Sequence, residues 1–199
     1  MSTAEPQITR ESLMREIRAR HPRFREAMVA DAAVWALYRG ERTEFHGRLD
    51  TLLQILRLMW SSDAFFAQSL YRAKASLQAL GVPLLPQLLH RLAILIGQVT
   101  IGDPVVIGPG LYLYHGLVVI DGVTVIGPGA RIAPFTTIGL VSGSIVGPTI
   151  GADVQVGTGA RVLGTLTIGD GVQIGANAVV LSDVEAGATV VGVPAKPVG

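Results

Sequence analysis

His115 is the residue of this chain best placed to move a proton. It is the only histidine between residues 99 and 199 and lies in the segment GLYLYHG. A neutral imidazole can accept the proton of a hydroxyl group. On the residues alone, a solvated turn histidine without a chemical role is the favoured interpretation. The other histidines, His21, His46 and His90, fall in the first half of the chain, where we expect surface or capping positions.

Two aspartates could support such chemistry or could have a purely structural role in a turn or a helix cap. Asp103 precedes Pro104, a pair that is typical of a turn. Asp63 follows two serines at the start of an apolar helical pattern, where an aspartate commonly caps a helix. The local sequence alone leaves the role of both carboxylates open.

The composition excludes several classes of protein. The chain has no cysteine, which excludes disulfides, thiolate metal sites and a cysteine acyl-enzyme and fits a cytoplasmic location. The net charge of +1 gives no reason to expect nucleic acid or an anionic membrane as a partner. Residues 1–21 are polar, unlike a signal peptide, and the apolar stretch 83–97 is too short to cross a bilayer. Because 49% of the residues are hydrophobic and 16% charged, we expect subunit interfaces.

The elements that must position these residues change in kind near Gln98. Residues 1–98 hold four of the 24 glycines, and residues 99–199 hold the other twenty. Apolar residues in the first part recur at helical spacing. We therefore expect an α-helical domain over 1–98 and a second domain over 99–199. The predicted helices are a short one around Leu13 and Ile17, followed by 24–38, 46–60, 64–80 and 85–96.

Aliphatic residues in the second part recur every six positions. This period fits a short strand plus a tight turn, with one aliphatic side chain per unit pointing into a core that stacked units share. The series gains one residue just after His115 and six residues before Ile150. Its members are Ile101, Ile107, Leu113, Ile120, Ile126, Ile132, Ile138, Ile150, Val156, Val162, Ile168, Ile174 and Val180.

The repeat, an aliphatic residue followed by Gly and then a small residue three positions later, resembles that of the hexapeptide-repeat acyltransferases. Within them the chain is most similar to the serine acetyltransferases, through IGPGLYLYHGLVV (107–119), GTGARVLGTLTIGDGVQIGANAVVLSDV (157–184) and GVPAKPVG (192–199). The resemblance implies an α+β fold in which an N-terminal α-helical domain precedes a left-handed parallel β-helix, with three hexads to a coil. It further implies acetyl-CoA as acyl donor, no metal, a place in cysteine biosynthesis, and a homotrimer or dimer of trimers with active sites between neighbouring coils.

The same resemblance gives His115 the role of catalytic base. The family has an aspartate fifteen residues earlier that orients the imidazole, but this chain has Thr100 there, with Asp103 three residues on. Either Thr100 or a backbone carbonyl orients the ring, or Asp103 substitutes from a shifted turn. Tyr114 replaces a second family aspartate and could donate a hydrogen bond into the acceptor site.

The acceptor site departs further from the family. Asp63 aligns with an aspartate that binds the amino group of serine. The loop 140–148 has Val146 and Gly147 in place of an Arg-His pair that binds the substrate carboxylate. Arg131, or an arginine of the helical half, could replace the missing cation, and a neutral loop would equally suit a sugar or another alcohol.

The positions that bind the acyl donor resemble those of the family more closely. Backbone amides at Gly139 and Leu140 are expected near the thioester, and the other expected acetyl-CoA contacts are Thr158, Gln173, Ala176 and Lys196. Small residues are also what the turns of the repeat require, so each of these positions has a purely structural alternative.

The sequence therefore predicts an acyltransferase that moves an acetyl group directly from acetyl-CoA to L-serine or a closely related small hydroxylated acceptor. Two alternatives are the same enzyme type acting on a sugar or biosynthetic intermediate, and a non-catalytic β-helix scaffold. A carbonic-anhydrase-type zinc site needs three convergent histidines and is not expected. No complex with cysteine synthase is expected either, because the sequence ends at Gly199 without the C-terminal tail that makes it.

Overall fold

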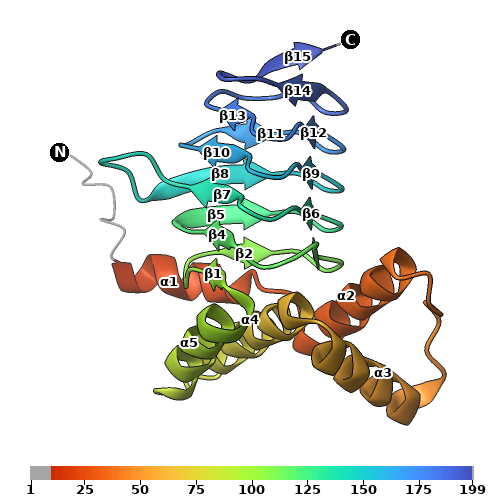
Figure 1. The fold of residues 1–199 in the computed structure, drawn as a ribbon. Coiled ribbons are helices and arrows are strands. Elements are labelled where there is room, and N and C mark those ends of the chain that lie inside the picture. Colours follow the sequence, from red (N-terminus) through yellow and green to blue (C-terminus); the bar gives the residue numbers. More distant parts are fainter. Residues whose placement is uncertain (1–9, 199) are drawn as a thin grey trace.

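The computed structural model describes residues 10–198. Within that range, five helices lie at one end of the molecule, and a stack of short strands, parallel except for the last one, rises from them (Figure 1). The helices are α1 (Arg10–Ala19), α2 (Phe24–Tyr38), α3 (Gly47–Ser61), α4 (Asp63–Ala79) and α5 (Leu85–Gly97).

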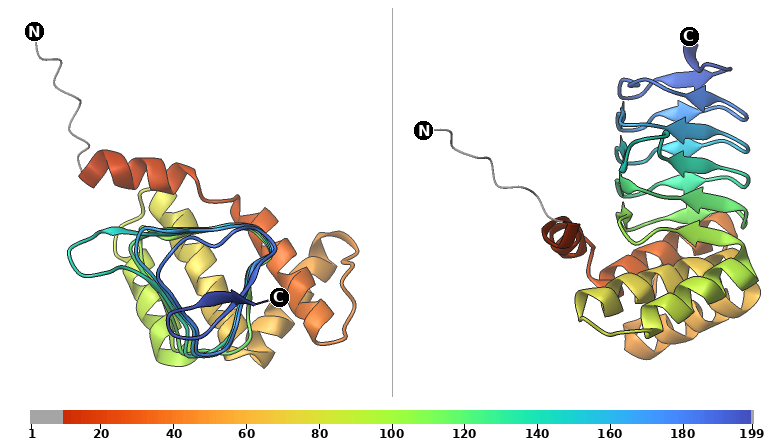
Figure 2. Two further views of the ribbon diagram at one scale, coloured as in Figure 1. Left: turned by 90° about the horizontal axis from the view of Figure 1, so that it is seen from above. Right: turned by 90° about the vertical axis from the view of Figure 1, so that its left-hand side faces the viewer.

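The strands form three sheets, which are the three faces of a prism. Face 1 contains β1 (Val99–Ile101), β4 (Val118–Ile120), β7 (Thr137–Gly139), β10 (Arg161–Leu163) and β13 (Val179–Val180). Face 2 contains β2 (Val106–Ile107), β5 (Val123–Ile126), β8 (Val146–Ile150) and β11 (Thr167–Ile168). Face 3 contains β3 (Tyr112–Leu113), β6 (Arg131–Ile132), β9 (Gln155–Val156), β12 (Gln173–Ile174), β14 (Thr189–Val191) and β15 (Lys196–Val198). Seen from above, the coils superimpose as a triangle (Figure 2).

The six-residue repeat predicts the register of these faces. On face 1, Ile101 pairs with Ile120, and Ile138 pairs with both Ile120 and Val162. The repeat's aliphatic residues form one such column inside each face, and each is at most 3% exposed. The expected α+β fold, a helical domain followed by a left-handed parallel β-helix, is confirmed. The division into domains at residue 98 stays a prediction.

The two irregularities of the repeat lie at different corners of the triangle. The coil that starts at Ile101 has one residue more than the 18-residue coil from Ile120 to Ile138, and the extra residue lies at the corner between faces 3 and 1, beside His115. The six extra residues lengthen the loop 140–148, whose last three residues belong to β8, and the loop projects from the corner between faces 1 and 2 (Figure 2).

The observed helices begin and end close to the predicted positions. Helix α2 has the predicted bounds, and α4 begins at Asp63 because the Ser62 side chain caps it by accepting a hydrogen bond from the Phe65 N–H. None of the helices within residues 10–198 combines the length and the apolar character that a membrane span requires.

Helix α4 closes the lower edge of the β-helix. In the coil above, the carbonyls of Ile120 and Ile126 accept hydrogen bonds from backbone N–H groups of the coil below. Their counterparts in the first coil have no coil beneath them, and side chains of α4 replace it. Lys74 Nζ donates to the Ile101 carbonyl (2.6 Å) and Arg72 Nη1 to the Ile107 carbonyl (2.6 Å). Gln68 likewise donates to the carbonyl of Leu111 (2.9 Å).

A buried ion pair completes this junction. Arg72 donates to both carboxylate oxygens of Asp31 in α2 (2.9 and 3.1 Å), and the two side chains are 3% and 0% exposed. The Asp31 carboxylate also accepts the backbone N–H groups of Gly110 and Leu111 (2.8 and 2.9 Å). Both side chains make their hydrogen bonds inside the protein. Removing one partner therefore leaves a buried charge unpaired.

We predict that Arg72→Ala lowers the free energy of unfolding by about 3–5 kcal/mol, since it leaves Asp31 unpaired in the core. The matched control is Arg57→Ala, which removes an exposed ion pair with Glu41 and should cost about 0–1 kcal/mol. Denaturant unfolding of both variants measures the difference. Equal midpoints would contradict the role assigned to α4.

Candidate active site

The first of two cavities that His115 lines is bounded by helix ends. We call it the helix-end cavity; its volume is about 510 Å³. The C-terminal end of α2, the N-terminal end of α4 and the C-terminal end of α5 form its walls, with the turn that carries His115. Its lining residues include Trp35, Arg39, Ser62, Asp63, Gly97, Gln98, Tyr112, Tyr114 and His115.

The second cavity, the face-3 groove, runs up the outer side of face 3 and has a volume of about 470 Å³. Tyr114 and His115 line its lower end and belong to the helix-end cavity as well. Its other lining residues include Arg131, Pro134, Gln155, Thr158, Gln173 and Thr189. A ligand in each cavity would therefore have its end beside the same imidazole.

Close contact with α5 fixes the turn that carries His115. A Cβ atom on Gly116 would lie 2.0 Å from the Gly97 carbonyl oxygen, so only glycine fits there. Leu117 adopts a left-handed conformation, with φ of 62°, and its N–H donates to the Gln98 carbonyl (2.9 Å). The His115 side chain itself is exposed.

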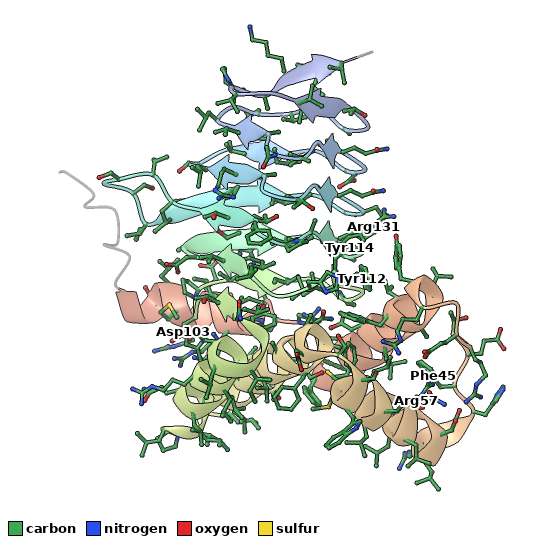
Figure 3. The ribbon with its side chains drawn as sticks, viewed as in Figure 1. Phe45, Arg57, Asp103, Tyr112, Tyr114 and Arg131 are labelled. Carbon is green, nitrogen blue, oxygen red and sulfur yellow. The ribbon has the colours of Figure 1, made fainter. Side chains whose placement is uncertain are left out.

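Aromatic rings hold the neighbouring Tyr114. Tyr112 stacks on Tyr38 at the end of α2 (4.4 Å between centroids) and contacts Tyr114 edge-on (4.8 Å). Arg131 Nη1 donates to the Tyr38 hydroxyl (3.0 Å), and Tyr112, Tyr114 and Arg131 lie together beside α2 (Figure 3). Burial raises the pKa of Tyr112 above its usual value, with smaller contributions from Tyr114 and Tyr38.

Asp63 faces the helix-end cavity and is exposed. The interpretation of Asp63 as the N-cap is wrong, because Ser62 occupies the cap and its hydroxyl accepts the Phe65 N–H (3.3 Å). The carboxylate of Asp63 is thus not consumed by capping. The structure brings together three of the predicted site residues here: Asp63, Tyr114 and His115.

Within one chain Asp103 is not near His115, so it does not orient the imidazole of its own chain. It lies at the corner between faces 1 and 2, across the base of the stack from Tyr114 (Figure 3). The ammonium of Lys74 approaches its carboxylate to 3.1 Å. Burial is the largest single effect and favours a higher pKa for Asp103, but the charge of Lys74 and the hydrogen bonds from Gln78 and Lys74 together hold that pKa below its usual value. Thr100 lies in β1 beside Val119 and lines neither cavity.

The residues expected to contact acetyl-CoA do not all lie at the same place in the structure. Thr158 and Gln173 line the face-3 groove, and Ala176 is exposed next to the lining residue Gly175. Gly139 and Leu140 lie instead at the corner between faces 1 and 2, and Lys196 is exposed in the last strand, β15.

The glycines of the groove have a structural cause. A Cβ atom on Gly157 would lie 2.7 Å from the backbone nitrogen of Ala176 in the next coil. Stacking of the coils therefore accounts for this glycine without a ligand. The fit to an acyl donor depends instead on the outward-facing polar side chains of the groove, namely Thr158, Gln173 and Arg131.

Two lining residues escaped the sequence prediction. Arg39 follows the last residue of α2 and Gln98 follows the last residue of α5, and neither belongs to a repeat or motif. Their only sequence signal is a position directly after a helix. Among residues 10–198 no group of three or more His, Cys, Asp or Glu side chains could hold a metal ion.

We predict that Ser62→Ala lowers the free energy of unfolding by about 1 kcal/mol, because the first turn of α4 loses its cap. Asp63→Asn should change stability by less than about 0.5 kcal/mol, as a surface substitution does. Denaturant unfolding compares the two variants. A larger loss for Asp63→Asn would return the capping role to Asp63.

Comparisons with known proteins agree with this architecture. Residues 147–182 match the family model described as bacterial transferase hexapeptide (six repeats). A serine acetyltransferase of Synechocystis sp. is 40% identical over 147 residues, which cover 72% of this chain and 59% of that protein. One from Helicobacter pylori strain J99 is 42% identical over 114 residues, or 55% of this chain and 66% of the relative. The chain thus spans less than two thirds of each of these relatives.

Solved structures give the same picture over more of the chain. The Neisseria gonorrhoeae serine acetyltransferase in complex with serine has a TM-score of 0.73 at 25% identity and covers 94% of this chain, which covers 82% of it. The Vibrio cholerae serine acetyltransferase has a TM-score of 0.74 at 26% identity and covers 100% of this chain, which covers 74% of it. By its repeat, its sequence and its fold, this chain is a hexapeptide-repeat protein of the serine acetyltransferase-like type.

Proposed function

We propose that this protein is an acetyl-CoA-dependent O-acetyltransferase for L-serine or a closely related small hydroxylated acceptor, with His115 as general base. One observation carries the proposal: His115 lines both cavities, as does its neighbour Tyr114. An acceptor in the helix-end cavity and a thioester in the face-3 groove would approach each other at this imidazole. Placing two reactants together is itself a large part of catalysis.

The face-3 groove fits an extended acyl donor. It runs along a flat sheet face, and Thr158 and Gln173 offer a hydroxyl and an amide to the polar groups of a pantetheine arm. Arg131 supplies positive charge at the lower end of the groove. The donor brings an acetyl thioester, and the protein's task is to position it and to control one proton.

The proposed transfer is direct. The imidazole of His115 accepts the proton of the acceptor hydroxyl, and the oxygen attacks the thioester carbonyl. The bond from carbon to sulfur then breaks, and the proton passes from the imidazolium to the leaving thiolate. Within residues 10–198 no hydrogen bond to the His115 ring is present, so the orientation of the ring by Thr100 or by a backbone carbonyl stays a prediction.

A homotrimer would complete the site. The loop 140–148 exposes Val141 and Ile145 (45% and 67%), and near the His115 corner Leu117 and Phe135 are exposed (42% and 56%). In a threefold arrangement of prisms, one corner of each copy can face another corner of its neighbour. Gly139 and Leu140, far from His115 in one chain, would then approach the His115 of the next copy. Pairing of two trimers and a cytoplasmic location stay predictions.

A sugar or biosynthetic intermediate is the alternative acceptor. It is favoured by the absence of a cation from the loop 140–148 and by the exposed ring of Tyr114, since aromatic faces pack well on apolar ligand surfaces. A non-catalytic scaffold would have no use for two cavities converging on one histidine. The expected absence of a cysteine synthase complex concerned Gly199, which lies outside the described residues.

We predict that His115→Ala lowers turnover by about 10²–10⁴, the range that general-base catalysis contributes, while acetyl-CoA binding survives. His46→Ala is the matched control, because His46 is exposed in the helical part and lines neither cavity. Release of CoA thiol measures turnover, and calorimetry measures binding. Near-wild-type turnover of His115→Ala would remove this residue from the role.

We also predict that Ile145→Asp weakens the trimer, because it places a charge in the expected contact. Sedimentation velocity should give about 63 kDa for the wild type, three times 20.9 kDa, or twice that mass if two trimers pair, and smaller species for the variant. Val198→Asp, at an exposed position on β15, is the control. A monomeric wild type with full activity would contradict the proposed arrangement.

A further inference from the structure

We propose that Arg39 is the cation that binds the carboxylate of the acceptor in the helix-end cavity, in place of the basic residues that the loop 140–148 lacks. The resemblance to the family already assigns the ammonium of such an acceptor to Asp63 and its hydroxyl to His115. The proposal rests on the acetyl transfer proposed above and names the residue that makes the cavity specific for a carboxylate.

Arg39 has hydrogen-bond donors that no residue of the described chain uses. Its Nε donates to Glu41 Oε1 (2.9 Å), and that same oxygen accepts from Arg57 Nη2 (3.0 Å). One carboxylate is therefore shared by two guanidinium groups, which leaves a net positive charge. Among residues 10–198, Arg39 Nη1 and Nη2 have no hydrogen-bond partner, and the Arg39 side chain is 34% exposed. A planar fork with two free donors suits a carboxylate.

The backbone of α2 directs Arg39 to the cavity. Arg39 is the C-cap of this helix, and its N–H donates to the carbonyls of Trp35 and Ala36 (both 3.2 Å). Trp35 and Tyr112 line the cavity with it. The positive charge of Arg39 lowers the pKa of Tyr112, against the larger effect of burial, so the guanidinium lies within electrostatic reach of that ring.

Asp63 presents the opposite charge in the same cavity. It is the first residue of α4, where the helix dipole favours a carboxylate, and Ser62 leaves it free of the capping role. No ion pair involves Asp63 within the described part of the chain. A cavity with one cation, one anion and one imidazole matches the three polar groups of a hydroxy amino acid, whereas a neutral sugar would leave both charges unpaired.

Other cations are less suitable for this role. Arg131 already donates to the Tyr38 hydroxyl and to the Asp153 carbonyl, and it lines the face-3 groove rather than the helix-end cavity. The loop 140–148 contains no basic residue. Among the residues that line the helix-end cavity, Arg39 is the one with a permanent positive charge.

The test compares L-serine with ethanolamine, which has the hydroxyl and the ammonium but no carboxylate. Arg39→Gln should lower kcat/KM for L-serine by about 10- to 100-fold, the size of a lost charge-assisted hydrogen bond, and change that for ethanolamine by less than about threefold. The KM for acetyl-CoA should not change. Arg57→Gln is the matched control, because Arg57 binds the same Glu41 oxygen but lies outside the cavity.

Asp63→Asn gives the reciprocal measurement. It should weaken L-serine about 10- to 100-fold while 3-hydroxypropanoate, which lacks the ammonium, changes little. If Arg39→Gln affects L-serine and ethanolamine equally, or affects neither, the assignment of Arg39 is wrong and the acetyltransferase activity stands.

If the wild type releases no CoA with any acceptor, the proposed function fails instead. Calorimetric binding of L-serine and ethanolamine then decides the assignment of Arg39. A preference for L-serine that is present in the wild type and lost in Arg39→Gln would support it, and a wild type without that preference would overturn it.

Discussion

The unpaired lower edge of the β-helix is the constraint on which the rest of the structure depends. A stacked coil presents a row of carbonyl groups to the coil below, and buried carbonyls without a donor are costly. Here the first coil receives its donors from Lys74, Arg72 and Gln68 of α4. Because these donors occupy fixed positions along one helix, the edge also determines how α4 lies across the stack.

The position of α4 determines where the other helices end. The ion pair with Arg72 fixes Asp31 of α2, and Asp31 in turn accepts a hydrogen bond from the turn before β3. Helix α2 is therefore held against that turn. Helix α5 packs along α4 and leads directly into β1. The ends of α2, α4 and α5 therefore meet at the one corner where the repeat has an extra residue, and that corner carries His115. The same contacts that stabilise the junction build the cavity.

The two cavities are built from different kinds of residue positions. The face-3 groove consists of repeat positions, so its shape follows from the stacking of identical units and its glycines serve the stack. The helix-end cavity is formed mainly by residues at or next to the ends of helices and by the turn that carries His115, where the repeat imposes little. Charges in that second cavity can change without disturbing a coil, which makes it the natural place for specificity to vary.

The sequence by itself determined the fold and the position of the irregular corner. A period of six fixes which side chain of each unit points inward, so the columns of Ile101, Ile107 and Leu113 follow from spacing alone. Helical spacing likewise predicted the bounds of α2. The six-residue period placed His115 beside a break in the repeat.

Only the tertiary structure decided which charged groups meet. Asp103 was one of the groups that could have oriented His115, because it is near in sequence to the family's aspartate position, but Lys74 contacts it from a helix that no local pattern connects to it. Arg39 and Asp63 are 24 residues apart in the sequence and line one cavity because their helices end at the same place. Periodicity reports the inward and outward faces of an element, whereas the meeting of two helix ends depends on how the whole helical layer packs.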